Sequence, residues 1–586
     1  MRRARVASLL TCLLLGSGAP ARTPLLAAQG DPLLDALRVE LERSASGLAL
    51  PGLERPYFLE YAAADLSILD LSASLGALVD SRLDHARPLR ADVRVGSYEL
   101  DNSEFLGRHG PSPRGSWGLV LEDDSLALRH DLWLATDTAY KQALEQMAQK
   151  RSALRNRMQT EAIPDFSRAA PAAELGPEPS QAFDVERWQG IVKRLSAVFR
   201  GFSAIQESRV DLHAASGSRY LVNGEGTRIR QPFTVAGLVV RASTQAEDGM
   251  QLAHYAPFYA RELSGLPSEP DLLAAARKLA EELSALRAAP VLERYVGPVL
   301  FTGPAAAEVF LQLLAPELSG QRPPLAEDDR TAARLPQGRI AERVGRKILP
   351  LFLSAVDDPT RSDYAGRALL GSYRYDEQGV AAQRVSLVEK GILRSLLMSR
   401  RPRKEIAASN GHGRASVYGA PSAEISNLIL EASPAKTEPE LEKALRDSCA
   451  QQGMEYGLRI DLLDLPFLSG REDLRGRGQE ALSPPVLAYK VYVADGRREL
   501  VRGLSVSDAD VRTLREITAA GDVSGVWSRP YVGRGLGFSS APGPIGTESL
   551  AVSVVAPALL FDEIELKRAP GALPRPVLLP NPALAE

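Results

Sequence analysis

Histidine is the first residue type to locate, because its neutral ring binds zinc and its pKa suits proton transfer near neutral pH. No two histidines of this chain lie within one helical turn of each other, so the sequence offers no local pair of histidine ligands. Zinc ligands can also come from distant parts of a chain, but this spacing favours surface or structural histidines. The six are His85, His109, His130, His213, His254 and His412.

Cysteine offers equally little to a metal or to nucleophilic catalysis. The chain has two cysteines, and Cys12 lies in a stretch that we expect to be removed, which leaves Cys449. A single thiol forms neither an internal disulfide nor a cysteine-based zinc site. The sequence also has no G-x-S-x-G motif, which carries the nucleophile in many serine hydrolases. The residues therefore predict no catalytic group.

Two other groups of residues are open to both a binding and a structural interpretation. His412 lies in the glycine-rich loop Asn410–Arg414, which either faces a peptide ligand or forms a turn whose histidine holds strands together. Arg384 either recognises a peptide carboxylate with its two-pronged head or pairs with Asp376 as an internal brace. We expect the brace.

Length and charge set the broad class of the protein. A chain of 586 residues exceeds one compact core, so we expect two large domains that meet near Ala289–Pro290. Its 70 Lys and Arg residues nearly balance 73 Asp and Glu residues, so no overall field attracts nucleic acid. The basic run Arg400–Lys404 contains Pro402 and no aromatic residue, which is typical of a solvated turn. We predict no nucleic-acid partner.

The N-terminus has the pattern of a secretory signal peptide. Three arginines precede an apolar run from Val6 to Leu15, and small residues and prolines follow, with cleavage expected near Ala21 or Ala28. The run is shorter than the roughly 20 residues that span a bilayer, and we expect no transmembrane segment in the mature chain. We predict export to the periplasm or the extracellular space. The predicted division of the chain is 1–28 (signal peptide), 29–290 (N-terminal domain) and 291–586 (C-terminal domain).

The periodicity of apolar residues predicts an α+β fold. Asp31–Ser46 and Asp131–Arg157 have helical spacing, whereas Tyr57–Asp80 alternates as antiparallel strands do. Strands dominate after residue 290, with a hairpin turn at Glu389-Lys390-Gly391 and a short helix at Asp508–Ala519. We therefore expect an N-terminal α/β domain with an antiparallel sheet and a strand-rich C-terminal domain.

Three stretches resemble the TldD/PmbA family of metallopeptidase-like proteins, also called modulators of DNA gyrase. The most specific runs from Gly371 to Arg384 (GSYRYDEQGVAAQR) and continues through a hairpin to the loop Ser409–Arg414 (SNGHGR). Arg94–Asn102 is similar to an N-terminal strand motif of the family, and Phe301–Glu308 is similar to the entry of its active-site helix. The resemblance implies a candidate peptide cleft that contains Tyr373, Tyr375, Gln383, Arg384, Asn410, His412 and Arg414.

Relatives of the TldD type are zinc peptidases that carry H-E-x-x-x-H on this helix and take a third ligand from a C-terminal cysteine. The corresponding positions here are Leu311, Gln312 and Pro316, and Gly535–Gly546 contains no cysteine. Leucine and proline have no side-chain lone pair for a metal, and glutamine cannot act as a general base. The resemblance therefore implies a member of the family without zinc, other cofactors or catalytic residues.

Three functions follow from this resemblance. The first is a non-catalytic subunit of the TldE/PmbA type, or a pseudopeptidase, that binds extended or unfolded peptides as a homodimer or beside a TldD-like catalytic subunit. The second is an active metallopeptidase with unrecognised ligands. The third is a structural envelope protein without a peptide cleft. Whether the chain is an enzyme stays open at this stage.

Overall fold

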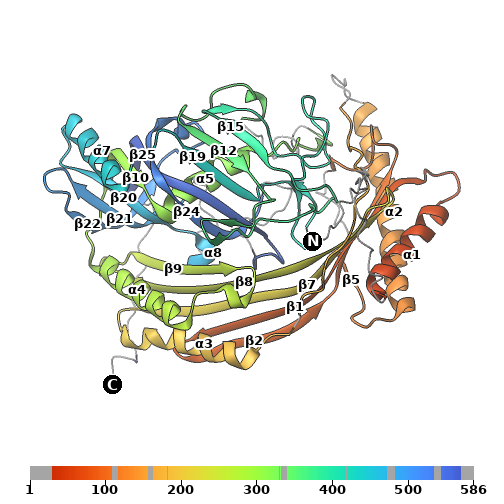
Figure 1. Cartoon of the computed structure of the whole chain (residues 1–586), viewed down its shortest axis with the longest axis horizontal. Coiled ribbons are helices and arrows are strands. Elements are labelled where there is room, and N and C mark those ends of the chain that lie inside the picture. Colours follow the sequence, from red (N-terminus) through yellow and green to blue (C-terminus); the bar gives the residue numbers. More distant parts are fainter. Residues whose placement is uncertain are drawn as a thin grey trace, which may run out of the picture.

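The computed structural model arranges the chain as two large sheets with helices packed on them (Figure 1). The predicted α+β class, with an antiparallel N-terminal sheet and a strand-rich C-terminal region, is confirmed. The predicted signal peptide lies outside the described residues. The structure describes residues 30–107, 116–155, 163–180, 182–328, 330, 340–417, 419–470, 482–533, 543–568 and 582.

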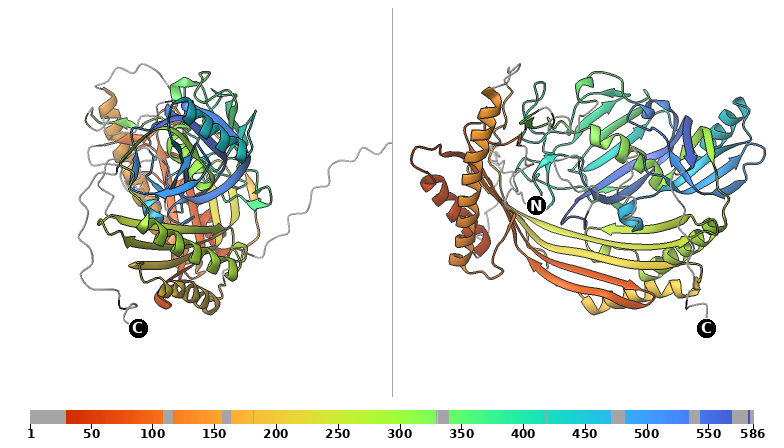
Figure 2. Two further views of the ribbon diagram at one scale, coloured as in Figure 1. Left: turned by 90° about the vertical axis from the view of Figure 1, so that its left-hand side faces the viewer. Right: turned by 180° about the vertical axis from the view of Figure 1, so that it is seen from behind.

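The N-terminal sheet has eight strands in the order β5-β3-β1-β7-β8-β6, with β2 added to β1 and β9 added to β8. All neighbours are antiparallel except β6, which runs parallel to β8. The long strands β1, β7 and β8 form a curved layer beneath the C-terminal sheet (Figures 1 and 2). The strands are Pro56–Ser74 (β1), Ala77–Ala86 (β2), Pro88–Val95 (β3), Ser116–Gly118 (β5), Ala173–Leu175 (β6), Glu207–Asn223 (β7), Arg228–Gln245 (β8) and Gln251–Ala260 (β9).

Four helices cover the two ends of this sheet. Helices α1 (Pro32–Gly47) and α2 (Ser125–Arg155) pack at one end, and α3 (Val185–Ala197) and α4 (Glu269–Ala288) pack at the other (Figure 1). Helix α1 begins where the side chain of Asp31 accepts a hydrogen bond from the backbone N–H of Leu34, which satisfies one of the free N–H groups of the first turn. Each helix buries an apolar stripe against the strands.

The C-terminal sheet has eleven strands in the order β16-β15-β12-β19-β25-β10-β20-β21-β22, and β23 and β24 also pair with β25. The predicted hairpin at residues 389–391 is confirmed, because β15 and β16 pair across it. The strands are Arg294–Phe301 (β10), Leu353–Asp357 (β12), Val385–Glu389 (β15), Ile392–Leu393 (β16), Asn427–Ala432 (β19), Tyr456–Leu463 (β20), Pro485–Tyr492 (β21), Arg498–Val501 (β22), Leu504–Val506 (β23), Ile517–Tyr531 (β24) and Leu550–Arg568 (β25).

Helix α5 (Gly303–Leu313) packs against β20, β24 and β25 and is buried on almost every side. Helices α7 (Glu438–Gln451) and α8 (Pro466–Ser469) complete this half. The remaining short strands form three pairs: β4 (Phe105–Leu106) with β11 (Leu325–Ala326), β13 (Asp363–Tyr364) with β14 (Arg367–Ala368), and β17 (Gly413–Arg414) with β18 (Ser422–Ala423). None of the helices in the described ranges combines the length and apolar character that a bilayer span requires.

The prediction of a helix at Asp508–Ala519 is wrong. The structure has only one 3-10 turn there, Thr513–Glu516, and β24 begins at Ile517. Pairing with the long strand β25 along residues 517–531 accounts for the difference, because a long ladder outweighs the weak helical preference of a short segment.

The two halves share an apolar interface. Leu468 of α8 and Val486 of β21 belong to the same hydrophobic cluster as the inner faces of α3 and α4. The hydroxyl of Tyr255, from β9, also donates a 2.5 Å hydrogen bond to the carbonyl of Leu463. The sequence boundary proposed near residue 290 falls between α4 and β10, where the chain passes from one sheet to the other.

Candidate functional site

Helix α5 and the 3-10 turn after it carry the three positions that correspond to the H-E-x-x-x-H motif of TldD-type relatives. Leu311 is 1% exposed and belongs to the C-terminal hydrophobic core. The amide of Gln312 donates to Glu308 at 2.8 Å and accepts from the backbone N–H of Ser483 at 2.8 Å. Pro316 is half-buried in the 3-10 turn Ala315–Glu317 that follows the helix. All three side chains serve packing or local hydrogen bonding.

A buried ion pair lies on the same helix, one turn before these positions. Glu308 is 1% exposed, and its Oε1 accepts from Arg529 Nε at 2.7 Å and from Trp527 Nε1 at 2.6 Å. Its Oε2 accepts from Arg529 and from Gln312, so both carboxylate oxygens are satisfied. A fully bonded carboxylate beside a guanidinium is not free to bind a cation.

The side chains present do not fit a zinc ion at the C-terminal end of α5. Hydrocarbon, amide and proline groups replace the expected ligands, and the nearby carboxylate is already paired. Among the described residues, no three His, Cys, Asp or Glu side chains gather as a metal site would require. Residues 534–542, which include most of the stretch expected near a third ligand, lie outside the described residues.

The Gly371–Arg384 motif forms a tight turn around Asp376. One oxygen of this carboxylate accepts hydrogen bonds from the backbone N–H groups of Gln378 and Val380, at 3.0 and 2.9 Å, and the other accepts from Gly413 at 2.8 Å. Asp376 is 2% exposed, and burial raises its pKa to about 7 despite these three bonds. The motif therefore fixes the shape of a loop.

The expected brace between Arg384 and Asp376 is wrong. Arg384 and Gln383 are both exposed, and backbone groups satisfy the Asp376 carboxylate instead.

The prediction that the basic run Arg400–Lys404 forms a solvated turn is also wrong at its first two residues. Arg400 is fully buried and its guanidinium lies 4.0 Å from the ring of Phe166, and Arg401 is 5% exposed. Partners far away in the sequence hold both.

At His412, the structure agrees with the structural interpretation of the loop Asn410–Arg414 and not with the peptide-binding one. His412 is fully buried, and its Nε2 lies 3.1 Å from Oδ1 of Asp357 in the core. The Asn410 side chain bonds to backbone groups of Met398 and Leu396. The structure therefore buries His412 out of reach of a peptide, and it uses the partly buried Asn410 side chain to hold neighbouring backbone.

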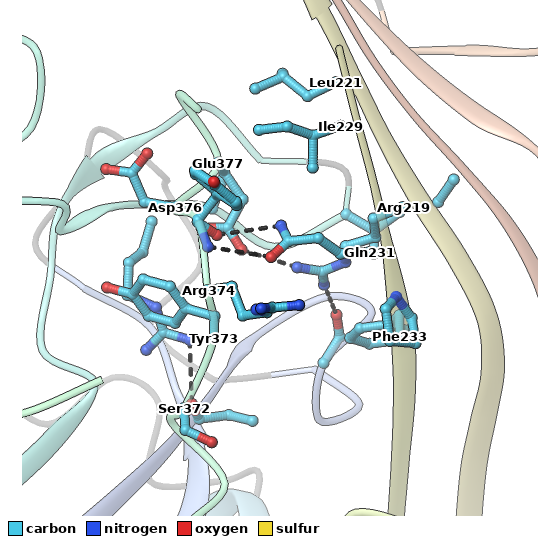
Figure 3. Close-up of a pocket in the computed structure, with 18 of the residues that line it drawn as sticks. Arg219, Leu221, Ile229, Gln231, Phe233, Ser372, Tyr373, Arg374, Asp376 and Glu377 are labelled. Carbon is cyan, nitrogen blue, oxygen red and sulfur yellow. Dashed lines mark hydrogen bonds and ion pairs between the residues drawn. The ribbon is translucent and has the colours of Figure 1, made fainter. Parts of the chain in front are cut away.

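Tyr373, Tyr375 and Arg414 do come together, at a cavity of about 470 Å³ between the two sheets. Strands β7 and β8 form one wall, and residues 372–377 form the facing wall (Figure 3). The loop 414–417 and the start of β25 close the remaining sides. Of the seven predicted cleft residues, these three line the cavity, and Gln383, Arg384, Asn410 and His412 do not.

Several residues of this cavity were not predicted, and they come from β7 and β8. Gln231 donates to the carbonyl of Tyr375 at 3.2 Å and accepts from its N–H at 3.1 Å, so one side chain holds the facing loop as a neighbouring strand would. Arg219 lies over the ring of Phe233 at 4.0 Å. Strand alternation puts Arg219 and Leu221, or Gln231 and Phe233, on one face, but it does not indicate what that face meets.

The cavity also exposes a short free edge of β8. Strand β6 pairs with residues 228–230 and β9 pairs with residues 236–245, so the described strands leave residues 231–235 without a neighbour on that side. In β8, the backbone groups of even-numbered residues face the side on which β6 pairs. The N–H and C=O of Thr234 therefore face the unpaired stretch of this edge. Pro232 is the other even-numbered residue of this stretch, and as a proline it has no backbone N–H that would be left unpaired. An extended segment could add here.

Beside the cavity, Asp70, His213 and Thr547 lie in the order carboxylate, imidazole and hydroxyl that hydrolytic triads have. His213 Nδ1 lies 2.7 Å from Asp70 Oδ1, and its Nε2 lies 3.4 Å from Thr547 Oγ1. Thr547 is 4% exposed and is not among the residues that line the cavity. The three residues join β1 and β7 to the segment before β25, which is a structural role.

The comparisons with known proteins agree with the fold. Residues 294–568 match the family model of the PmbA/TldA metallopeptidase C-terminal domain. Two solved structures resemble the chain: TldE from Thermococcus kodakarensis (TM-score 0.56, 12% identity, 91% of this chain and 99% of that one) and a candidate DNA gyrase modulator from Thermotoga maritima (TM-score 0.56, 14% identity, 87% and 96%). At these identities the likeness concerns the fold alone.

Curated relatives match over a short stretch. A metalloprotease from Methanothermobacter thermautotrophicus is 34% identical over 90 residues, which are 15% of this chain and 18% of that protein. A metalloprotease from Archaeoglobus fulgidus is 28% identical over 89 residues, or 15% and 20%. The matched segment thus spans about a fifth of the curated relatives. Through its C-terminal domain, residues 294–568, the chain belongs to the TldD/PmbA family.

Proposed function

We propose that this chain is a zinc-less member of its family that binds extended peptides in the cavity between its sheets, as a non-catalytic TldE/PmbA-type subunit or a pseudopeptidase. One observation carries the proposal: Leu311, Gln312 and Pro316 occupy the positions of the expected H-E-x-x-x-H motif with groups that pack or bond locally. Glu308, the nearest carboxylate on that helix, is already paired with Arg529.

The cavity supports the peptide-binding part of the proposal. Its wall includes the free edge of β8 at residues 231–235, where a short extended peptide can add through main-chain hydrogen bonds. Apolar side chains of Leu221, Ile229 and Leu370 also line it and can bury side chains of such a peptide. The cavity therefore favours peptide binding over the third function, a structural envelope protein without a peptide cleft.

The partner and the location are part of the same proposal. The fold shared with TldE supports a role beside a TldD-like catalytic subunit that carries an intact H-E-x-x-x-H motif, with a homodimer as the other form. The sequence of the first 28 residues supports export, so we expect the pair to act in the periplasm or outside the cell. Mass spectrometry of the mature N-terminus, with cleavage expected near Ala21 or Ala28, tests the location.

Metal analysis and peptide binding test the function together. The chain, purified without chelator, is expected to contain far less than one zinc per molecule and to leave unfolded peptides intact at high protein concentration. It is expected to bind an extended peptide in a fluorescence assay, and N-methylation of alternate peptide nitrogens should weaken binding because it removes main-chain donors. Equal binding of the methylated peptide would rule out strand addition.

An active metallopeptidase is the second candidate, and the metalloprotease names of the short-matching relatives favour it. It predicts one zinc per chain and hydrolysis that a chelator abolishes. Those two results together would overturn the proposal of a non-catalytic chain, whereas binding without metal or cleavage would exclude the second candidate.

A further inference from the structure

The cavity between the sheets has an excess of positively charged side chains. Its three acidic lining residues, Glu174, Asp376 and Glu377, are outnumbered by arginines. Arginine is the residue that pairs with carboxylates through two parallel hydrogen bonds, so the balance of charge is informative about a ligand. The arginines that line the cavity are Arg90, Arg219, Arg261, Arg374 and Arg414.

Two of the three acids are already used by the protein. Glu377 Oε1 accepts from Arg219 at 2.8 Å, and Glu174 forms an ion pair with Arg374. The third, Asp376, is bonded to three backbone N–H groups and forms no salt bridge within the described part of the chain. These carboxylates therefore neutralise only two of the five arginines.

Arg261 and Arg414 have no carboxylate partner among the described residues. Arg261 donates through Nη2 to the carbonyl of Leu369 and to the hydroxyl of Ser372. Arg414, which is 6% exposed, donates to the carbonyls of Ile425 and Ala551, at 2.6 and 3.3 Å. Its Nε is buried and makes no hydrogen bond. Neutral acceptors orient both guanidiniums but leave their charge uncompensated.

The remaining arginines tie the two halves of the molecule together. Arg90 pairs with Glu60 and donates to the carbonyls of Gly419 and Glu377, and Arg219 donates to the carbonyl of Gly546. Burial, partly offset by Glu377, lowers the pKa of Arg219, and the nearby charges of Arg414 and Arg90 lower it further. A structural role explains these contacts, but it does not explain why the positive charge exceeds the negative charge.

Two arginines keep donors free for a ligand. Nε and Nη1 of Arg261 make no hydrogen bond to the described residues. The Arg374 side chain is 76% exposed and lies in the opening between Tyr373 and Phe233 (Figure 3). Both side chains line the same cavity as Arg414, whose charge would also act on an anion bound there.

We propose that the cavity is an anion subsite that selects peptides by a carboxylate, with Arg261 and Arg374 as its direct donors and Arg414 as a further uncompensated charge in its lining. The carboxylate can come from the C-terminus of a peptide or from a Glu or Asp side chain. The apolar end of the cavity, at Leu221 and Ile229, would take a neighbouring apolar side chain. This inference rests on the proposed peptide-binding function and adds a preference to it.

Four matched peptides separate the sources of the carboxylate. One sequence is made with an internal Glu or Gln, each with a free or an amidated C-terminus, and binding is measured by fluorescence anisotropy. We expect the fully neutral peptide, with Gln and an amidated end, to bind at least about tenfold more weakly than its best carboxylate counterpart, as loss of a charge-assisted hydrogen bond predicts. Comparing the Glu and C-terminal arms identifies the carboxylate that is read.

Arg261→Gln is expected to remove this preference, so that acidic and neutral peptides bind alike, and Arg261→Lys is expected to retain part of it. Arg82→Gln is the control, because Arg82 is 63% exposed on β2, outside the cavity. Should Arg261→Gln fail to fold, Arg374→Gln removes the exposed donor with little effect on packing.

Three results would overturn the inference, each in a different way. Equal binding of neutral and acidic peptides by the unmodified protein would refute the anion subsite and leave the peptide cleft intact. Absence of binding by all four peptides would refute the cleft itself, and the subsite with it. A preference for acidic peptides that persists in both Arg261→Gln and Arg374→Gln would place the subsite elsewhere.

Discussion

At the scale of single residues, Glu308 is the buried carboxylate on which the packing of α5 depends. Its carboxylate is enclosed by Arg529, Trp527 and Gln312, all of them hydrogen-bond donors. Removing one partner of such a pair lowers stability strongly, because the remaining charge stays buried without a partner. The pair therefore commits the carboxylate of α5 to an internal contact.

Arg529→Met is expected to lower the free energy of unfolding by about 3 kcal/mol or more, because it leaves Glu308 buried and unpaired. The double variant Glu308→Leu/Arg529→Met should recover a large part of this loss, since it removes both charges. Urea unfolding of Arg529→Met, Glu308→Leu, the double variant and the parent measures the difference. A double variant as unstable as the sum of both single variants would show that the residues do not act as a pair.

Asp376 predicts a pH dependence of stability with a defined sign. Burial raises its folded-state pKa to about 7, whereas the unfolded chain has the usual value near 4. Between these values the folded state keeps a proton that the unfolded state loses, so stability falls as the pH rises, by up to about 1.4 kcal/mol per pH unit. The penalty is absent below about pH 4 and complete above about pH 7.

Asp376→Asn is expected to remove this component, so that the difference in unfolding free energy between variant and parent changes steadily from pH 4 to pH 7 and is constant above it. At low pH the variant should be less stable, because its amide N–H₂ cannot accept the bond from Gly413. The exposed Asp84→Asn is the control. A constant difference across the whole range would mean that Asp376 is ionised throughout.

At the scale of elements, the loop before β17 depends on one glycine. Gly411 has φ of +74°, and a Cβ there would lie 2.3 Å from the carbonyl oxygen of Ala381. Gly366 has nearly the same φ, +76°, but nothing lies near its Cβ position. We expect Gly366→Ala to cost about 1 kcal/mol for its backbone conformation and Gly411→Ala clearly more, because the loop must shift. Thermal unfolding of both variants checks this order, and equal losses would contradict it.

The elements also show how far the sequence could predict the structure. The 389–391 hairpin and the long antiparallel strands were predictable, because turn chemistry and alternation are local. The helix at 508–519 was not, because pairing with β25 is a long-range interaction. The same limit applies to the site: a sequence motif located Tyr373 and Tyr375, but only the folded chain brings Gln231 across to them.

At the scale of the whole molecule, the shared interface decides whether the two sheets are stable separately. The cavity needs both of them, since β7 and β8 form one wall and C-terminal loops form the others. Helix α8 and β21 bury apolar side chains among α3 and α4, and several arginines bridge the halves. An interface of this kind couples the stabilities of the parts it joins.

We therefore expect the chain to unfold in a single calorimetric transition, and Leu468→Ala to move that transition as a whole. Leu468 is 3% exposed at the interface, so its truncation should cost about 2–4 kcal/mol, whereas Leu121→Ala, at a side chain 49% exposed, should cost little. If the heat-capacity profile of Leu468→Ala instead splits into two peaks, the halves unfold independently. The cavity would then lie between separable bodies, and peptide affinity would depend on how often they meet.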